Sequence, residues 1–164
     1  MKTIFKEYFP HGPLPGKIIP YAHKGEWAVH EILPFLFQYI GPFHLSVASF
    51  NISEDSLRPM FFMKEKNKLL SVRFLFDMNV HRHKIDMMFF SSSVADQIRL
   101  SSTHMKILLV QNRLINFAMV GSANMNLVMR HEAGIMTTED TTFNYYKQYY
   151  DKVFENDSIP FIFE

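Results

Sequence analysis

Two apolar runs that lie close together constrain the fold of this chain more than any other feature. They span Ile107–Val110 and Leu114–Val120, and a short polar break, Gln111-Asn112-Arg113, separates them. Short apolar runs that are bounded by polar or turn residues are typical of buried strands. Because the break is short, we expect the two strands to pair side by side as a hairpin. The chain therefore contains a buried sheet, and polar residues next to these runs gather at one end of it.

The residues at that end carry the groups that phosphate chemistry needs. His104 and Lys106 precede the first run, and side chains two residues apart on an extended strand share a face. The second run stops at Gly121-Ser122-Ala123-Asn124, which brings a hydroxyl, an amide and turn N–H groups to the same end. A potential nucleophile then lies beside a positive charge and several hydrogen-bond donors. This arrangement is suited to holding a phosphate and attacking it.

Length and composition limit the class of protein. A chain of 164 residues is long enough for one domain with a real core. The formal net charge is +1, so any nucleic-acid-binding surface must come from local clustering of basic residues. The absence of cysteine excludes disulfides, thiolate metal sites and a cysteine nucleophile. No apolar run has transmembrane length and the N-terminus has no signal-peptide core, so the sequence predicts a soluble, cytoplasmic protein without stable membrane association.

The remaining pattern predicts a single domain. Residues 1–25 are rich in proline and glycine and are expected to form a lead-in loop, and residues 26–164 are expected to form the domain. The predicted helices are 25–40, 53–67, 80–91 and 142–154, and further strands are predicted at 43–50, 69–76, 97–100 and 130–137. Strands that alternate with helices and are then followed by adjacent strands indicate an α/β sandwich, with a mixed β-sheet flanked by helices.

The polar pattern resembles the signature of the phospholipase D superfamily. That signature is H-x-K, four residues, Asp, six residues and G-S-x-N; this chain has His104-Met105-Lys106 and Gly121-Ser122-Ala123-Asn124. Family members also tend to carry a glutamate on the following strand, and Glu132 stands at a suitable position. Upstream, residues 47–50 and 72–77 resemble the strand–helix–strand that begins a family domain. The resemblance implies a phospholipase D-like α/β sandwich over about residues 26–140.

The chain departs from the family pattern at two points. The family Asp, five residues after the lysine, is replaced by Gln111. The segment between Lys106 and Gly121 is also three residues longer than in the family pattern. Three extra residues fit a longer hairpin tip, because the strands can still pair in register. The change to Gln111 leaves the predicted nucleophile and phosphate ligands in place.

The resemblance also implies a mechanism and a partner. Family members with one copy of the signature form homodimers that share a site on the two-fold axis, so it implies self-association of this chain. His104 would attack phosphorus and form a phosphohistidine, while the second copy's His104 protonates the leaving oxygen. Lys106, Ser122 and Asn124 would bind the phosphate oxygens, and Glu132 would hold the tautomer of His104. Neither a metal nor another cofactor would be required.

Three functions remain open from the sequence. The leading hypothesis is a metal-independent phosphodiesterase, a nuclease that acts on DNA or RNA. A second is a phospholipid phosphodiesterase. A third is a degenerate phospholipase D-like module that binds nucleic acid or serves assembly without catalysis, which Gln111 and the longer hairpin favour.

Several residues have a second interpretation. Glu132 lies in a strand that looks buried, and because a buried carboxylate needs a partner, Arg130 is the alternative to His104. The run His81-Arg82-His83-Lys84 could contact a polyanion or form a solvated helix face. Asn126 is expected to be structural. The methionines, eleven in all, are expected to fill the core or a dimer surface.

Overall fold

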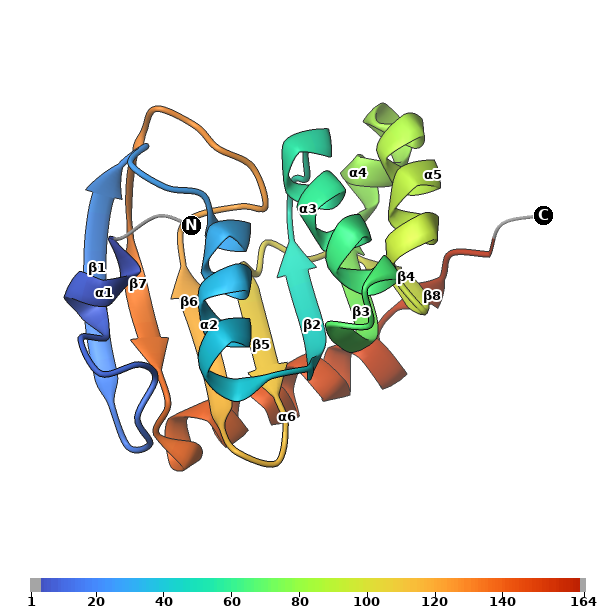
Figure 1. The fold of residues 1–164 in the computed structure, drawn as a ribbon. Helices are drawn as coiled ribbons and strands as arrows, with labels where there is room; N and C mark the ends of the chain where they lie inside the picture. Colours follow the sequence, from blue (N-terminus) through green and yellow to red (C-terminus); the bar gives the residue numbers. More distant parts are fainter. Residues whose placement is uncertain (1–3, 163–164) are drawn as a thin grey trace.

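The computed structural model describes residues 4–162, which form one eight-stranded mixed sheet between two layers of helices (Figure 1). The strands are β1 (Ile18–Lys24), β2 (Phe43–Ser49), β3 (Leu69–Asp77), β4 (Gln97–Ser101), β5 (Ile107–Gln111), β6 (Asn116–Gly121), β7 (His131–Thr137) and β8 (Ile159–Pro160). Their order in the sheet is β1-β7-β6-β5-β2-β3-β4-β8. β3 is parallel to both β2 and β4, and the other pairs are antiparallel. This architecture confirms the predicted α/β sandwich.

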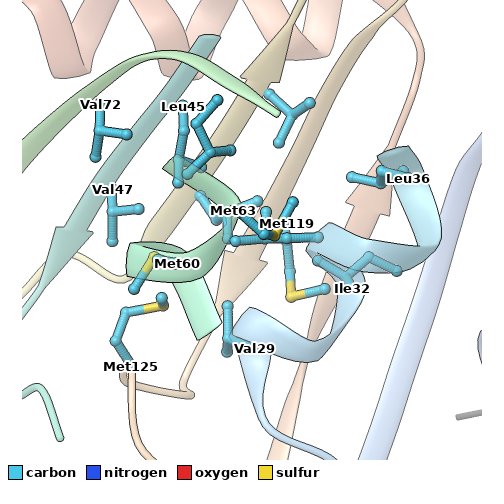
Figure 2. Packing of buried hydrophobic residues seen from close by; sticks show 14 of the residues in the cluster. Val29, Ile32, Leu36, Leu45, Val47, Met60, Met63, Val72, Met119 and Met125 are labelled. Atoms are coloured by element: carbon cyan, nitrogen blue, oxygen red, sulfur yellow. The ribbon is translucent and has the colours of Figure 1, made fainter. Parts of the chain in front are cut away.

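The helices divide unequally between the two faces of the sheet. They are α1 (Phe5–Tyr8), η1 (Val29–Glu31), α2 (Ile32–Ile40), α3 (Glu54–Glu65), α4 (Met78–His83), α5 (Ile85–Val94) and α6 (Asp140–Asn156). Among the helices of residues 4–162, only α6 crosses the rear face in the view of Figure 1. The other helices lie on the front face over the larger core. In that core, Met60 and Met63 of α3 pack close to the aliphatic side chains of β2, as predicted for core methionines (Figure 2).

The lead-in loop predicted for residues 1–25 is wrong over much of its described part. Residues Ile18–Lys24 form β1, which pairs antiparallel with the whole of β7, and a short helix precedes it. A proline is acceptable here because β1 is an edge strand, where a missing N–H costs no ladder hydrogen bond. Only Tyr21 is buried in this strand, so its apolar pattern is weak. Residues 1–3 and 163–164 lie outside the described part of the chain.

The helix predicted over 80–91 is divided in the structure. α4 ends at His83 and α5 begins at Ile85, because Lys84 leaves the helical backbone region with φ −138° and ψ 54°. The helix predicted over 25–40 starts later, at Val29, and Pro34 fits within the first turn of α2, where a missing N–H costs no helical hydrogen bond. No helix within residues 4–162 is long and apolar enough to cross a membrane.

The hairpin of β5 and β6 pairs in register, as predicted for a hairpin with a longer tip. β5 and β6 pair from Ile107 opposite Val120 to Gln111 opposite Asn116, so the extra residues are confined to the tip. Asn112 organises that tip, because its side-chain oxygen accepts hydrogen bonds from two backbone N–H groups at 2.9 and 3.1 Å. The two motif segments therefore meet at the opposite end of the hairpin.

Candidate active site

The five residues predicted for the site line one pocket of about 550 Å³. They are His104, Lys106, Ser122, Asn124 and Glu132. The pocket lies at the end of the sheet where β2 and β6 finish and where β5 and β7 begin. The ends of these four strands thus bring their side chains to one place. The sequence motifs predicted this for the segments beside β5 and β6.

His104 and Lys106 lie together in the segment just before β5. Lys106 Nζ is 3.1 Å from His104 Nδ1 and donates a hydrogen bond to the His104 carbonyl oxygen at 2.9 Å. The ring centroid of Phe50 lies 4.6 Å from that of His104 and 5.7 Å from Lys106 Nζ. Burial lowers the pKa of the Lys106 ammonium, and the negative charge of Glu132 opposes this shift. The two motif side chains therefore share one side, as predicted.

A buried carboxylate fixes the backbone that carries His104. Asp77, the last residue of β3, is 6% exposed. One of its oxygens accepts from Thr103 N at 3.1 Å and the other from Asn79 N at 2.8 Å. The Thr103 hydroxyl in turn accepts from Met105 N at 3.1 Å. Because hydrogen bonds to an ionised carboxylate are stronger than neutral ones, Asp77 holds the segment in one conformation.

Asn124 connects the second motif segment to the end of β2. Its Oδ1 accepts hydrogen bonds from Phe50 N at 3.0 Å and from Asn51 N at 3.1 Å. The buried Ser49 hydroxyl accepts from Met125 N at 3.1 Å. With its oxygen engaged, Asn124 has its amide NH₂ group available to the pocket. That group is a donor, which suits a phosphate oxygen.

The contact predicted between Glu132 and His104 is absent from the described part of the chain. Glu132 instead accepts a hydrogen bond from the Ser122 hydroxyl, which itself accepts from Ala133 N at 3.1 Å. The reason is the strand order: Ser122 follows β6, next to the strand of Glu132, whereas His104 precedes β5, one strand further away. The alternative partner, Arg130, forms no ion pair with Glu132 among residues 4–162 either.

The motif glycine is required by close packing. Gly121 on β6 lies opposite Gly134 on β7, and the Tyr21 side chain from β1 reaches both residues. A Cβ atom at Gly121 would lie 2.5 Å from the Tyr21 hydroxyl, and one at Gly134 would overlap the carbonyl oxygen of Val120. Burial raises the pKa of Tyr21 to about 12, and the negative charge of Glu132 adds to the effect. The N-terminal strand thus supports the wall of the pocket.

Solved structures of low sequence identity share this architecture. A phospholipase D family member, Nuc from Salmonella typhimurium, superposes with a TM-score of 0.64 at 13% identity, over 88% of this chain and 97% of that chain. This chain has the phospholipase D fold. Polyphosphate kinase from Porphyromonas gingivalis and phosphatidylserine synthase from Haemophilus influenzae each give a TM-score of 0.58 at 14% identity over 88% of this chain.

The likeness to these proteins concerns the fold alone. The match spans 27% of the polyphosphate kinase chain and 40% of the phosphatidylserine synthase chain, so most of each of those chains lies outside it. No protein-family model and no curated protein sequence matches this chain. The expected phospholipase D-like architecture is therefore confirmed from structure rather than from sequence similarity.

In this phospholipase D fold, Gln111 lies outside the pocket. It ends β5, whereas Lys106 precedes the same strand, so the two residues are at opposite ends of it. Gln111 lines a separate pocket of about 240 Å³ together with His44, Arg73 and Lys147. Replacing the family Asp here therefore changes none of the side chains that line the His104 pocket.

Sequence reasoning missed or set aside several residues of the pocket. They are Phe50, Asn51, Asn126, Val128, Arg130 and His131. Phe50 and Asn51 follow β2, and the rule that sites form beyond the carboxyl ends of parallel strands could have indicated them. Asn126, expected to be structural, lines the pocket with its side-chain oxygen buried and without a hydrogen-bond partner in the described chain. Arg130 is exposed at the rim.

The charge of the pocket favours an anionic ligand. Lys106 and Arg130 contribute positive charge, and Glu132 is the one carboxylate among the described residues that line the pocket. Across residues 4–162, no three histidine, aspartate or glutamate side chains converge closely enough to hold a metal ion. The described side chains offer cations and amide or hydroxyl donors to an anion.

Proposed function

We propose that this protein is a metal-independent phosphodiesterase, and specifically an endonuclease that hydrolyses DNA or RNA with His104 as its nucleophile. The observation that carries the proposal is the convergence of His104, Lys106, Ser122 and Asn124 on one pocket. A nucleophile, a cation and neutral donors are the groups required for displacement at phosphorus. The phospholipase D fold, shared with Nuc, is consistent with this chemistry.

The first step forms a bond from an imidazole nitrogen of His104 to phosphorus. For Nε2 to attack, the ring proton of His104 must lie on Nδ1. In that tautomer the Lys106 ammonium, which can only donate, bonds the His104 carbonyl oxygen and not Nδ1. The phosphorus–oxygen bond to the leaving strand breaks, and that oxygen takes a proton from an acid. Lys106, the Asn124 amide and the Ser122 hydroxyl stabilise the charge on the other phosphate oxygens. Water then attacks phosphorus and gives a proton to the conjugate base of that acid, and the nitrogen–phosphorus bond breaks and regenerates His104.

We further propose that two copies of the chain build one site. The reaction needs an acid as well as a nucleophile, and His104 of a second copy can supply the proton if the pockets meet on a two-fold axis. The loop between β6 and β7 supports such a contact. Leu127 and Met129 in this loop flank the pocket residue Val128 and are 51% and 72% exposed, so they offer an apolar pair beside the pocket. Burying them in a symmetric interface would stabilise the dimer.

A catalytic function is favoured over a binding module for a specific reason. The argument for a degenerate module depended on Gln111 and on the longer hairpin. Gln111 lines a different pocket, and the extra hairpin residues lie at the tip, away from His104. Neither change alters the lining of the proposed active site.

The direct test is cleavage of single-stranded DNA, double-stranded DNA and RNA in excess EDTA. The wild type is compared with His104→Ala and with His44→Ala, a matched control at the other end of the sheet. We expect cleavage that survives EDTA, disappears in His104→Ala and persists in His44→Ala. Loss of cleavage in EDTA, or equal cleavage by His104→Ala, would contradict the proposal. Release of a phospholipid headgroup that depends on His104, without nucleic-acid cleavage, would reassign the substrate.

A further inference from the structure

A short basic segment lies at the same end of the sheet as the pocket. It comprises His81, Arg82, His83 and Lys84, and is called the α4 tract below. α4 follows directly from the end of β3, and Figure 1 shows it at the sheet end that also carries the loop between β6 and β7. β3 is two places from β5 in the sheet, so the strand that leads into α4 lies roughly 10 Å to one side of β5.

The α4 tract is attached to two segments that form the pocket. At its start, Asp77 accepts hydrogen bonds from Asn79 N and from Thr103 N, the residue before His104. At its end, Lys84 Nζ donates to the Ile52 carbonyl oxygen at 3.1 Å, next to the pocket residue Asn51. These bonds hold the tract in a fixed position relative to the site.

Arg82 and His83 are the side chains of the α4 tract that are available to a ligand, because Lys84 is bonded to Ile52 and the His81 ring contacts Phe161. His81, Arg82 and His83 are exposed, and Arg82 has no ion-pair partner within residues 4–162. Glu54, at the start of neighbouring α3, is already paired with Arg58. Asp55 and Asp86 are the other carboxylates that begin helices on this side. The tract therefore combines fixed placement with positive charge that no described acid neutralises directly.

A second exposed cation lies on the opposite flank of the pocket. Arg130 precedes β7, which is also two places from β5 but on the other side of it. It lines the pocket and forms no ion pair in the described chain. The α4 tract and Arg130 thus adjoin strands on either side of β5, and these strands, β3 and β7, are roughly 20 Å apart along the sheet end.

We propose that the α4 tract and Arg130 bind phosphates of a nucleic-acid strand on either side of the phosphodiester held at His104. This inference rests on the proposed function and adds the path of the substrate to it. Arginine forms bidentate hydrogen bonds with phosphate, so Arg82 and Arg130 are the principal contacts. A ligand with one phosphate cannot reach both flanks, whereas a polynucleotide carries charges at regular spacing along its length.

Binding is tested in the His104→Ala background, so that the strand is not cut. Fluorescence anisotropy of labelled oligo(dT) is measured over a range of salt for Arg82→Gln and Arg130→Gln. The matched control is Arg113→Gln, which removes the same charge at the hairpin tip, at the other end of the sheet. We expect each test variant to raise Kd several-fold and to reduce the slope of log K against log salt by about 0.7, the value for one phosphate contact on a single strand. Arg113→Gln should leave both quantities unchanged.

A second readout separates a binding role from damage to the fold. In a chain that retains His104, Arg82→Gln should hydrolyse bis(p-nitrophenyl) phosphate at the wild-type rate, because this small diester occupies only the pocket. Equal salt slopes for Arg82→Gln and Arg113→Gln would overturn the proposal. So would weaker binding of Arg82→Gln to phosphatidylserine vesicles with unchanged oligo(dT) binding, which would assign the tract to a membrane surface. Since binding is measured without His104, absence of cleavage in the wild type would count against the proposed function alone.

Discussion

The polar groups at the two ends of strand β5 differ in whether their positive charges are paired with a carboxylate. At its start, Lys106 and His104 face a pocket of about 550 Å³ that contains a single carboxylate among its described lining residues. At its end, Gln111 faces a pocket of about 240 Å³ whose two cations, Arg73 and Lys147, share one carboxylate. There, Arg73 donates to Asp151 at 2.8 Å, and Lys147 forms an ion pair with the same carboxylate. One end offers positive charge to a ligand, and the other uses its charges within the fold.

This difference shows that the H-x-K pair and the residue at the family Asp position lie in different places in the fold. Lys106 and Gln111 are five residues apart, so they lie on opposite faces of the strand and about 17 Å apart along it. Their side chains line different pockets. The residue at the family Asp position should therefore affect packing and stability rather than chemistry.

The largest expected effect contrasts the two ends directly. His104→Ala should reduce the rate of phosphodiester cleavage by about 10³-fold or more, because it removes the proposed nucleophile. Gln111→Ala should change that rate by no more than about threefold, since distant sites act independently. Steady-state kinetics on one oligonucleotide measures both. A large loss of rate in Gln111→Ala, with its thermal unfolding unchanged, would break the comparison.

A smaller effect is expected at the glycine pair beside the pocket. Gly134→Ala should lower the free energy of unfolding by about 2–3 kcal/mol, because its Cβ would meet backbone atoms of β6. Urea denaturation is the measurement, with Ala133→Ser, at the exposed neighbouring position, as the control. Unchanged stability of Gly134→Ala would show that β6 and β7 can separate there without cost.

At the end of the sheet away from the His104 pocket, a helix-capping carboxylate should make the stability of the fold depend on pH. Glu139 caps α6, and its hydrogen bonds to the Thr142 hydroxyl and to Thr141 N and Thr142 N lower its pKa to about 2. A folded-state pKa below the unfolded value of 4.5 gives stability that is present above pH 4.5 and is lost as pH falls toward 2. Glu139→Gln should therefore be less stable than wild type at neutral pH, and the difference should shrink in that window. Urea denaturation of both proteins at several pH values between 2 and 7 measures this difference.

The smallest effect is expected from restoring the family residue. Gln111→Asp places a carboxylate in the pocket of Arg73 and Lys147, which already share Asp151. Exposed ion pairs contribute little, so we expect a change in unfolding free energy of about 1 kcal/mol or less. Cleavage rates should stay at the wild-type level. A substantial gain in rate would mean that the two ends of β5 are coupled.

The sequence predicted the parts of the site that depend on local pairing. His104 and Lys106 meet Ser122 and Asn124 because one hairpin register, with Ile107 opposite Val120, brings them together. Two adjacent strands with a short connection make such a register readable from the sequence.

What the sequence did not predict depends on contacts between distant segments. β1 was missed because its pairing with β7 joins remote parts of the chain and its apolar pattern is weak. Phe50 enters the pocket because β2 is the neighbour of β5, which the motif itself does not reveal. Glu132 contacts Ser122 rather than His104 for the same reason: the choice between nearby partners follows from strand order.

The central claim is that His104 forms a covalent bond to phosphorus, and trapping that adduct tests it most directly. Wild-type protein is mixed with a labelled oligonucleotide in EDTA and quenched in SDS at alkaline pH, where a phosphohistidine survives. We expect labelled protein whose modified peptide contains His104, with no label in His104→Ala and full label in His44→Ala. Label at another residue, or equal labelling of His104→Ala, would contradict the account.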